Sequence, residues 1–301
     1  MRSRSQYLGV FMLFITVQLA ALAYVPLLNE MGIQAFEDPG DPVNPLIYVA
    51  YLIIATAGLL VLMKYARASM VRALFMLAIF GTLFIVFLPM TITLSGSWAV
   101  AETVSTAIAL AFTFLLWNRP TWMVINAIGF IVGFGSAAIL GVSLGVVPAM
   151  VLLVALAVYD AVAVYRTKHM LTLAEGVTKL RLPILFIVPR DLKYDMSEFD
   201  DLDLRKDEQE GRTTIMMGVG DAVIPGILVV SAAVFLADGN DYTTSSLSVA
   251  FGTMLGSVIG FVLLMVLVSK GRPQAGLPFL NGGALIGFLI SHLFILGDLP
   301  F

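Results

Sequence analysis

Nine long runs of apolar residues take up most of this chain and limit what it can fold into. Each run is about 17–25 residues long, the length at which an α-helix crosses the hydrocarbon core of a bilayer. The chain is 59% hydrophobic and only 12% charged, whereas roughly a quarter of the residues in soluble domains are charged. We therefore predict an all-α membrane protein with nine transmembrane helices, at residues 7–28, 46–63, 70–90, 97–117, 121–141, 145–165, 213–236, 246–268 and 277–297.

The charged residues predict how these helices are oriented. All 17 lysines and arginines fall on the side of the N-terminus, 16 of them in alternate loops and Arg72 at the start of the third run. Because basic residues concentrate in cytoplasmic loops, we expect the N-terminus in the cytoplasm and the C-terminus outside. The charged residues of the opposite loops are all acidic: Glu30, Glu37, Asp38, Asp41, Asp238, Asp241 and Asp298.

One hydrophilic segment interrupts the apolar pattern after the sixth run. It divides the chain into a six-helix part (1–165), a cytoplasmic loop (166–212) and a three-helix part (213–301). The charge-rich stretch 191–210 is typical of a mobile loop. The apolar island 182–189 is too short to cross a bilayer and contains two prolines, so we predict an extended segment there, with a short interfacial helix as the alternative.

The composition also excludes several classes of function. A net charge of only -3 argues against nucleic acid as a partner. Without cysteine, the chain has no disulfide, no thiolate metal site and no cysteine nucleophile. Its two histidines, His169 and His292, give a metal site little support. We expect no cofactor.

Two aspartates, Asp160 and Asp221, stand inside apolar runs, where a carboxylate is costly and usually marks a function. Asp160 precedes the basic Arg166 by six residues, or ~9 Å along a helix. Asp221 follows Arg212 by nine residues, or ~14 Å at most. Both aspartates therefore belong to the cytoplasmic half of adjacent antiparallel helices, and they can face each other.

Paired carboxylates of this kind can carry out general acid–base chemistry. Two carboxylates in contact at a low-dielectric site share a proton and titrate as a pair. One can take a proton from water while the other donates a proton to a carbonyl oxygen, as in aspartic proteases. The same residues could instead relay protons or ions, or form a polar contact between helices. From the residues alone, hydrolysis and transport are both open.

The motifs around the aspartates resemble those of the presenilin-type intramembrane aspartyl proteases, a family that includes the signal peptide peptidases. The shared motifs are Tyr159-Asp160 and Gly218-Val219-Gly220-Asp221, in successive helices separated by a long cytoplasmic loop. The family's Pro-Ala-Leu-Pro element has a partial counterpart at 275–278, where Leu277 and Pro278 match and the first two positions differ. The expected orientation points to the presenilin branch, because signal peptide peptidases are inverted.

This resemblance implies roles for the motif residues. Asp160 and Asp221 would be the catalytic pair, Gly218 and Gly220 would keep the backbone accessible beside Asp221, and Val219 between them would help to shape the site. Tyr159 would hydrogen-bond near the pair, and Leu277 and Pro278 would shape the cleft. Ordinary structural roles remain as alternatives: helix packing for the glycines, an interfacial anchor for Tyr159 and a helix start for Pro278.

The resemblance also implies what the protein acts on. The expected activity is hydrolysis of peptide bonds inside transmembrane segments, so the partners are transmembrane substrate proteins and the lipid bilayer. A homo-oligomer is compatible with the sequence, and accessory subunits are not evident from it. The alternatives are a proton-coupled transporter or ion channel that uses the aspartates as a relay, and a non-catalytic scaffold.

A substrate helix must unwind before its peptide bonds can be cut, because its amides are occupied by internal hydrogen bonds. We hypothesise that the unwound segment adds as a strand to extended protein segments near the site. The candidate segments are the island 182–189 and residues 213–217.

Overall fold

The computed structural model describes residues 2–65, 67–167, 182–190, 214–237, 242–268 and 274–297. The predicted mobile stretch 191–210 and His169 lie outside the described residues. The chain forms two compact units, and neither is continuous in sequence. The first unit comprises Met1–Leu13, Gly58–Gly135 and Leu171–Val219, and the second comprises Phe14–Ala57, Ser136–Met170 and Gly220–Phe301.

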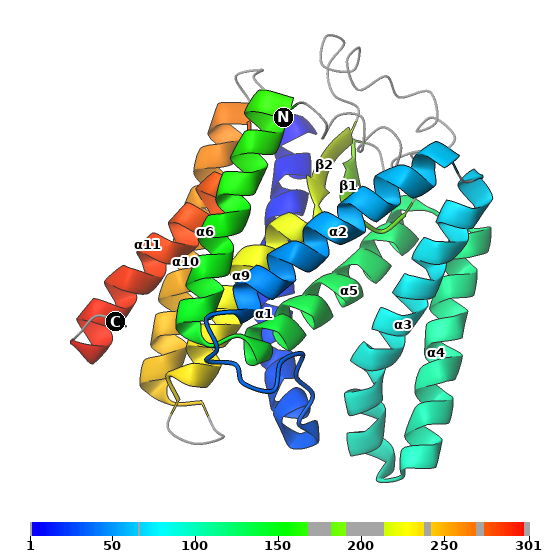
Figure 1. Cartoon of the computed structure of the whole chain (residues 1–301), viewed down its shortest axis with the longest axis horizontal. Helices are drawn as coiled ribbons and strands as arrows, with labels where there is room; N and C mark the ends of the chain where they lie inside the picture. Colours follow the sequence, from blue (N-terminus) through cyan, green and yellow to red (C-terminus); the bar gives the residue numbers. More distant parts are fainter. Residues whose placement is uncertain are drawn as a thin grey trace. The chain divides into compact units, whose positions relative to one another are not determined.

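Within the described ranges the chain forms nine α-helices, one π-helical turn and two strands (Figure 1). The helices are α1 (Arg2–Met31), α2 (Asn44–Tyr65), α3 (Ala68–Ser95), α4 (Trp98–Asn118), α5 (Trp122–Ser143), α6 (Val146–Val162), α9 (Val219–Phe235), α10 (Thr244–Val268) and α11 (Leu277–Leu296). The π-helical turn Ala163–Thr167 continues α6, and the strands are β1 (Leu185–Pro189) and β2 (Thr214–Gly218).

Each predicted apolar run overlaps one of these helices, so the multi-pass membrane architecture is confirmed. Seven of the described helices are long and apolar enough to cross a membrane, and the apolar helices Asn44–Leu59 and Val219–Phe235 are shorter. Large apolar side chains such as Leu94, Phe114 and Phe294 are mostly exposed, which suits helices in contact with lipid.

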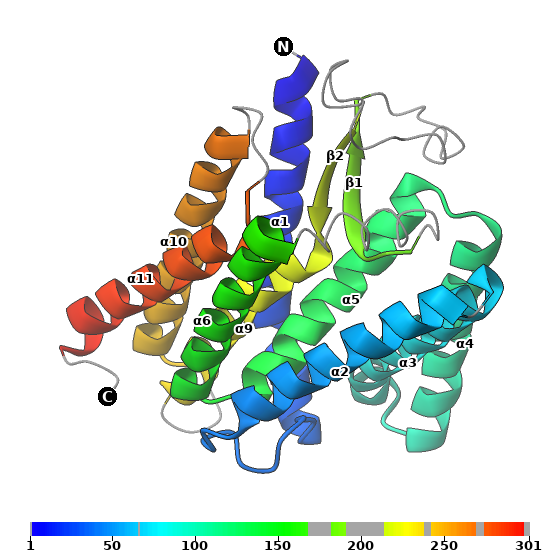
Figure 2. The same ribbon diagram turned by 45° about the horizontal axis from the view of Figure 1, so that its top comes forward.

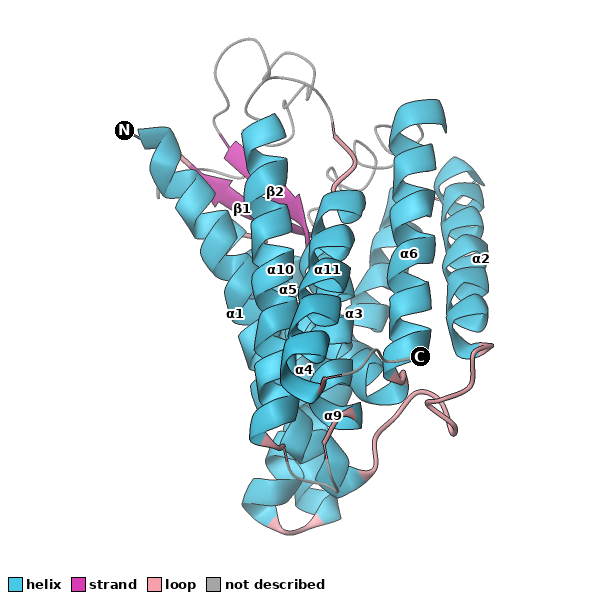
Figure 3. Cartoon of the chain, turned by 90° about the vertical axis from the view of Figure 1, so that its left-hand side faces the viewer, coloured by secondary structure: helices cyan, strands magenta, loops and turns pink. Residues whose placement is uncertain are grey.

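The seventh run differs from its prediction. The sequence predicted a helix from residue 213, but the helix begins at Val219, because residues 214–218 form β2. Strand β2 pairs with β1 in an antiparallel sheet (Figure 3), and this pairing satisfies backbone groups that would otherwise need a helix. The prediction of extended segments is confirmed for both candidates, and the all-α description holds for the membrane helices only.

In the first unit, an apolar core joins α3, α4 and α5 to the segment around β1. Helices α3 and α4 run side by side (Figure 1). Two of their polar side chains meet across the pair: the Thr91 and Ser105 hydroxyls lie 2.6 Å apart. The core residues are Met76, Ile79, Leu83, Ala109, Leu116, Ile125, Ile128, Leu182 and Ile187.

Strand β1 is attached to two helices of the same unit. The Asn126 side chain of α5 donates to the Ile187 carbonyl at 2.7 Å and accepts from the Ile187 amide at 2.8 Å. The Gln6 side chain of α1 donates to the Val188 carbonyl at 3.2 Å. Gly9 lets α1 approach β1 closely, since a Cβ on Gly9 would lie 2.9 Å from Val188 Cγ1. These contacts fix β1 in place.

In the second unit, α11 lies between α10 and α6 (Figure 2). The backbones of α10 and α11 nearly touch, because a Cβ on Gly256 would lie 2.2 Å from the Gly283 carbonyl oxygen, and one on Gly260 would lie 2.1 Å from the Phe279 carbonyl oxygen. The glycine repeat of α10, Gly252, Gly256 and Gly260, is therefore a close-packing motif. An apolar groove of about 490 Å³ runs along this pair, lined in part by Pro278 and Gly282.

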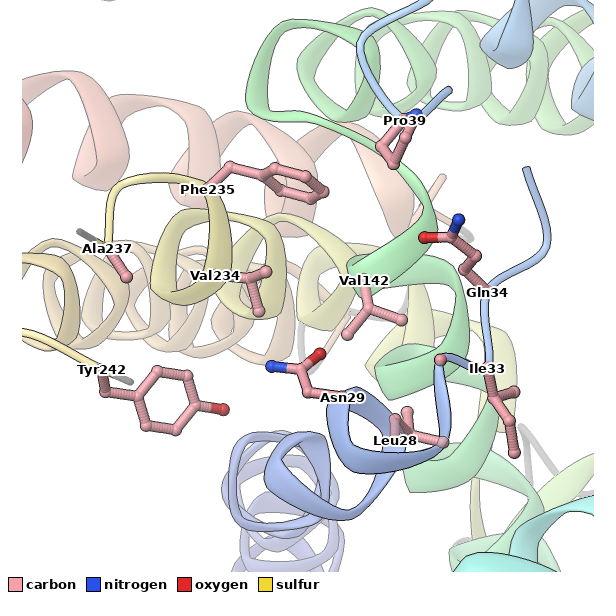
Figure 4. A pocket seen from close by; sticks show the side chains of 11 residues that line it. Leu28, Asn29, Ile33, Gln34, Pro39, Val142, Val234, Phe235, Ala237 and Tyr242 are labelled. Atoms are coloured by element: carbon pink, nitrogen blue, oxygen red, sulfur yellow. The ribbon is translucent and has the colours of Figure 1, made fainter. Parts of the chain in front are cut away.

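A second cavity in this unit, of about 220 Å³, lies where α1, α5 and α9 end (Figure 4). Its polar side chains are Asn29, Gln34 and Tyr242, and the Tyr242 hydroxyl donates to the Leu22 carbonyl at 2.8 Å. Burial raises the pKa of Tyr242 well above its usual range. Its lining within the described chain includes no carboxylate, histidine, lysine or arginine, so this cavity is not a candidate for acid–base chemistry.

Candidate functional site

Asp160 lies in the last turn of α6, and only 4% of its surface is exposed. A buried carboxylate requires hydrogen-bond donors. The Leu277 amide of α11 donates to Asp160 Oδ2 at 3.0 Å, and the Gly276 backbone also interacts with this carboxylate. Asp160 is thus held by a segment that lies 117 residues away in the sequence.

The start of α11 explains why its backbone reaches toward Asp160. The first amides of any helix lack partners inside the helix, and an N-cap side chain usually supplies one. Here the N-cap is Gly276, which has no side chain, and Pro278 has no amide hydrogen. The amides of Phe279 and Leu280 donate to the Gly276 carbonyl, and the Leu277 amide is left for Asp160. Asp160 therefore caps α11 from a neighbouring helix.

Asp221 approaches the same segment from α9. It is the third residue of α9, in the first helical turn, and it is partly buried. A Cβ added to Gly276 would lie 3.7 Å from Asp221 Oδ2 and 3.8 Å from Asp221 Cγ. The structure thus brings both predicted carboxylates to two consecutive residues, Gly276 and Leu277, all within the second unit.

This convergence matches the arrangement that acid–base hydrolysis needs. Two carboxylates at one site within apolar helices can share a proton and can act together on a water and a carbonyl group. No group of three or more histidine or acidic residues that could hold a metal ion occurs in the described part of the chain.

A second polar contact joins α6 and α11 one to two helical turns away from the aspartate. The Asn281 side chain donates to the Leu153 carbonyl at 2.9 Å. Asn281 is one helical turn after Leu277, and Leu153 is two turns before Asp160, so the same faces of the two helices meet twice. Asn281 therefore forms a hydrogen bond between the two helices.

The other predicted site residues have varied surroundings. Gly218 ends β2 opposite Leu185, and the Val219 amide donates to the Ile184 carbonyl at 2.8 Å. Gly220 is exposed, and a Cβ there would meet nothing within 4 Å. Gly220 therefore borders open space, and its role beside Asp221 stays a prediction.

Tyr159 and Pro278 face away from the contacts made by Asp160. Tyr159 precedes Asp160, but 45% of its surface is exposed. Neighbouring helical residues do not share a face, so a buried Asp160 turns Tyr159 outward. Pro278 is in the first turn of α11 and lines the apolar groove along α10 and α11. The hydrogen bond expected of Tyr159 near the aspartates stays a prediction.

Sequence reasoning did not assign roles to three residues that form part of this site: Gly276, Tyr165 and Gln274. Gly276 directly precedes Leu277, and its departure from the family motif was the only sign of its importance. The Tyr165 hydroxyl donates to Gln274 Oε1 at 2.9 Å and lies 3.4 Å from the Ala275 amide, which donates to it. Nothing in the sequence pairs residues so far apart.

Comparison with known proteins supports the chemistry that this geometry suggests. Residues 11–296 match the family described as signal-peptide peptidase, presenilin aspartyl protease. A solved structure of a presenilin family intramembrane aspartate protease in the P2 space group is 36% identical, with a TM-score of 0.70, and the match covers 95% of this chain and 97% of that one. A second such structure, in the C222 space group, is 34% identical, with a TM-score of 0.71, and the match covers 96% and 99%. Comparison with curated proteins gave no significant match.

The family match extends over nearly the whole chain, and the two solved structures agree with it in sequence and in fold. The resemblance inferred from the motifs is therefore confirmed. This chain belongs to the signal-peptide peptidase and presenilin family of intramembrane aspartyl proteases.

Proposed function

We propose that this intramembrane aspartyl protease uses Asp160 and Asp221 as its catalytic dyad to cut peptide bonds within transmembrane segments of other proteins. The observation that carries the proposal is the approach of both carboxylates to Gly276 and Leu277. The alternative of a proton-coupled transporter or channel receives no support from the comparisons, since the matched family and both solved structures are proteases.

The proposed reaction uses water as the nucleophile. One aspartate takes a proton from the water, and the other donates a proton to the oxygen of the scissile carbonyl. The Leu277 amide orients the Asp160 carboxylate through Oδ2, so that its other oxygen can turn toward the substrate. Open space beside Gly220 gives the extended substrate a place next to Asp221. Leu277 shapes the cleft beside Asp160, while Pro278 lines the groove along α10 and α11.

The decisive experiment compares the wild type with Asp160→Asn and Asp221→Asn. Each purified protein is incubated with a synthetic peptide that contains one apolar transmembrane segment, and the products are identified by mass spectrometry. Because general acid–base catalysis supplies about 10²–10⁴-fold, each variant should lose at least about 10²-fold in cleavage rate. A transition-state mimic of aspartyl proteolysis should block the wild type. Wild-type rates in either variant would exclude the dyad.

The surroundings of β1 suggest which strand receives the substrate. Both backbone groups of Ile187 bond to Asn126, so they point away from β2. In an antiparallel pair, the backbone N–H and C=O groups of two opposite residues either both point toward the partner strand or both point away from it. Met216 is opposite Ile187, so its amide and carbonyl also point away from the ladder. The outer edge of β1 is thus occupied at Ile187, and we assign substrate addition to the edge of β2.

Chain continuity connects this edge to the dyad. Strand β2 ends at Gly218, α9 begins at Val219, and Asp221 is its third residue. A substrate strand hydrogen-bonded to Met216 would therefore be bound only a few residues from Asp221 along the chain. Backbone pairing would replace the internal hydrogen bonds that the substrate helix gives up when it unwinds.

Met216→Pro tests this assignment. Proline removes the amide hydrogen that points outward, and an outward position on an edge strand is where a sheet tolerates proline. We expect at least about a tenfold loss in kcat/KM, equivalent to one or two lost backbone hydrogen bonds. Met216→Ala, which keeps the amide, is the matched control and should cleave at close to the wild-type rate. Equal cleavage by the proline variant would rule out addition at β2.

Orientation and substrate type complete the proposal. The distribution of basic residues supports a cytoplasmic N-terminus and an outside C-terminus, which fits single-span substrates whose N-termini are outside. Because the chain has no cysteine, single cysteines introduced at Ser3 and at Asp298 can be labelled with a membrane-impermeant reagent in intact cells. Only Asp298→Cys should react. Labelling of Ser3→Cys alone would show that the N-terminus is outside and the C-terminus is in the cytoplasm.

A further inference from the structure

The segment 274–277 determines the geometry of both aspartates. Its Leu277 amide donates to Asp160, and its Gly276 backbone lies beside Asp221. Any contact that fixes this segment therefore also fixes the relative placement of the two carboxylates. Gly276 has no side chain that could anchor the segment, so other residues must hold it.

Tyr165 makes such a contact. Its hydroxyl donates to Gln274 Oε1 at 2.9 Å and accepts from the Ala275 amide at 3.4 Å. One hydroxyl group thus binds two consecutive residues directly before Gly276. The Tyr165 ring itself is 56% exposed, so the residue is not buried as part of an apolar core.

The local structure of α6 explains how Tyr165 reaches this segment. Tyr165 is five residues after Asp160, whereas residues on one face of an α-helix are three or four apart. Beyond Val162 the helix widens into the π-helical turn Ala163–Thr167, whose hydrogen bonds span five residues. Such turns are frequent at functional sites. Asp160 and Tyr165 consequently both contact the segment that begins α11.

We propose that Tyr165 is a positioning residue of the protease: it holds Gln274 and Ala275 so that Gly276 and Leu277 meet the two aspartates. Tyr165 acts through the segment and does not touch the reacting atoms. The proposal rests on the assignment of Asp160 and Asp221 as the dyad. It predicts that loss of the hydroxyl impairs the chemical step while leaving substrate binding nearly intact.

The test uses Tyr165→Phe in the full-length protein, with Tyr51→Phe as the matched control. Both tyrosines are exposed residues of the second unit; Tyr165 donates to Gln274, whereas Tyr51 belongs to α2 and has no part in the proposed site. With a single-span synthetic peptide as substrate, Tyr165→Phe should lower kcat about tenfold, the effect of one to two lost hydrogen bonds, with little change in KM. Tyr51→Phe should retain the wild-type kcat.

A double-mutant cycle with Gln274→Ala identifies the route of the effect. If Tyr165 acts through Gln274, the double variant should be about as slow as Tyr165→Phe alone. If the two substitutions instead lowered kcat by independent factors that multiply in the double variant, the positioning role of Tyr165 would be wrong. Titration of active sites with a transition-state mimic gives kcat per folded molecule, and a full wild-type value in Tyr165→Phe would likewise overturn it.

The outcome can be separated from that of the proposed function. If the asparagine variants of the dyad are inactive while Tyr165→Phe matches the wild type, only the positioning role is wrong. If the asparagine variants remain active, the dyad assignment fails whatever Tyr165→Phe does.

Discussion

The two sides of α11 are built on opposite principles. Toward α10, glycines bring the backbones into direct contact, and a Cβ on Gly287 would lie 2.4 Å from the Gly252 carbonyl oxygen. Toward α6, the helix is held by polar contacts, from Leu277 to Asp160 and from Asn281 to Leu153. One side leaves no room for a methyl group, and the other carries the candidate chemistry.

This difference indicates which contact can give way. Helices in a bilayer associate mainly through close van der Waals packing, which is extensive on the α10 side. Hydrogen bonds between membrane helices average only about 0.6 kcal/mol each. The α6 side is therefore the weaker contact, and α11 should stay with α10 whenever the site opens to admit water or substrate.

Adding bulk on the α10 side should have the largest effect. In Gly256→Leu, the new side chain would collide with the backbone of Gly283 and Gly287, and overpacking of this kind costs about 3 kcal/mol. Thermal unfolding in detergent should show a clear drop in stability. Gly282→Leu is the control, because a Cβ there meets nothing within 4 Å. Equal unfolding temperatures for the two variants would show that the close packing is unimportant.

Removing one polar contact on the α6 side should have a smaller and different effect. Asn281→Leu loses the bond to Leu153, about 0.6 kcal/mol, and should slow cleavage about threefold if all of that is lost from the transition state. Ser291→Ala is the matched control, because the Ser291 hydroxyl donates to the Val249 carbonyl of α10 at 3.2 Å. It should leave kcat unchanged. The comparison of the two sides would fail if both variants slowed cleavage equally.

The smallest effect is expected at the segment that both aspartates approach. Gly276→Ala restores the family residue, and its methyl group would make ordinary contacts of 3.6–3.8 Å with Leu264 and Asp221. Gly276 has φ -77°, which any residue adopts. We expect kcat within about twofold of the wild type, since the methyl group meets no atom closer than 3.6 Å and the backbone angles of Gly276 suit alanine. A loss of tenfold or more would show that the backbone needs glycine at this position.

Much of the fold and the central pair of the site could be predicted because their signals are local. Runs of apolar residues mark the helices, and Asp160 and Asp221 stand out because a carboxylate is costly in lipid. The start of α9 was misplaced, since apolar length alone does not distinguish a strand from the first turns of a helix. The division of the chain at 165 and 213 stays a prediction about sequence order.

The remainder of the site depends on contacts between distant segments. No local pattern announces that Leu277 donates to Asp160, or that Tyr165 reaches Gln274, because neither contact follows from helical periodicity. The motif resemblance pointed to Leu277 and Pro278 without explaining their role. The role of Leu277 becomes clear only from the structure: its N-cap Gly276 has no side chain to accept from the Leu277 amide, and Asp160 accepts from it instead.

The two hydrogen bonds between Asn126 and the backbone of Ile187 have a consequence for the number of substrate strands that the sheet can bind. A two-stranded sheet normally offers two sites for pairing, one on each flank. Because the Asn126 side chain already occupies the outer edge of β1 at Ile187, only the edge of β2 would be left to pair with a substrate strand. Different substrates would then exclude one another, and a bound product strand would block the next round until it departs.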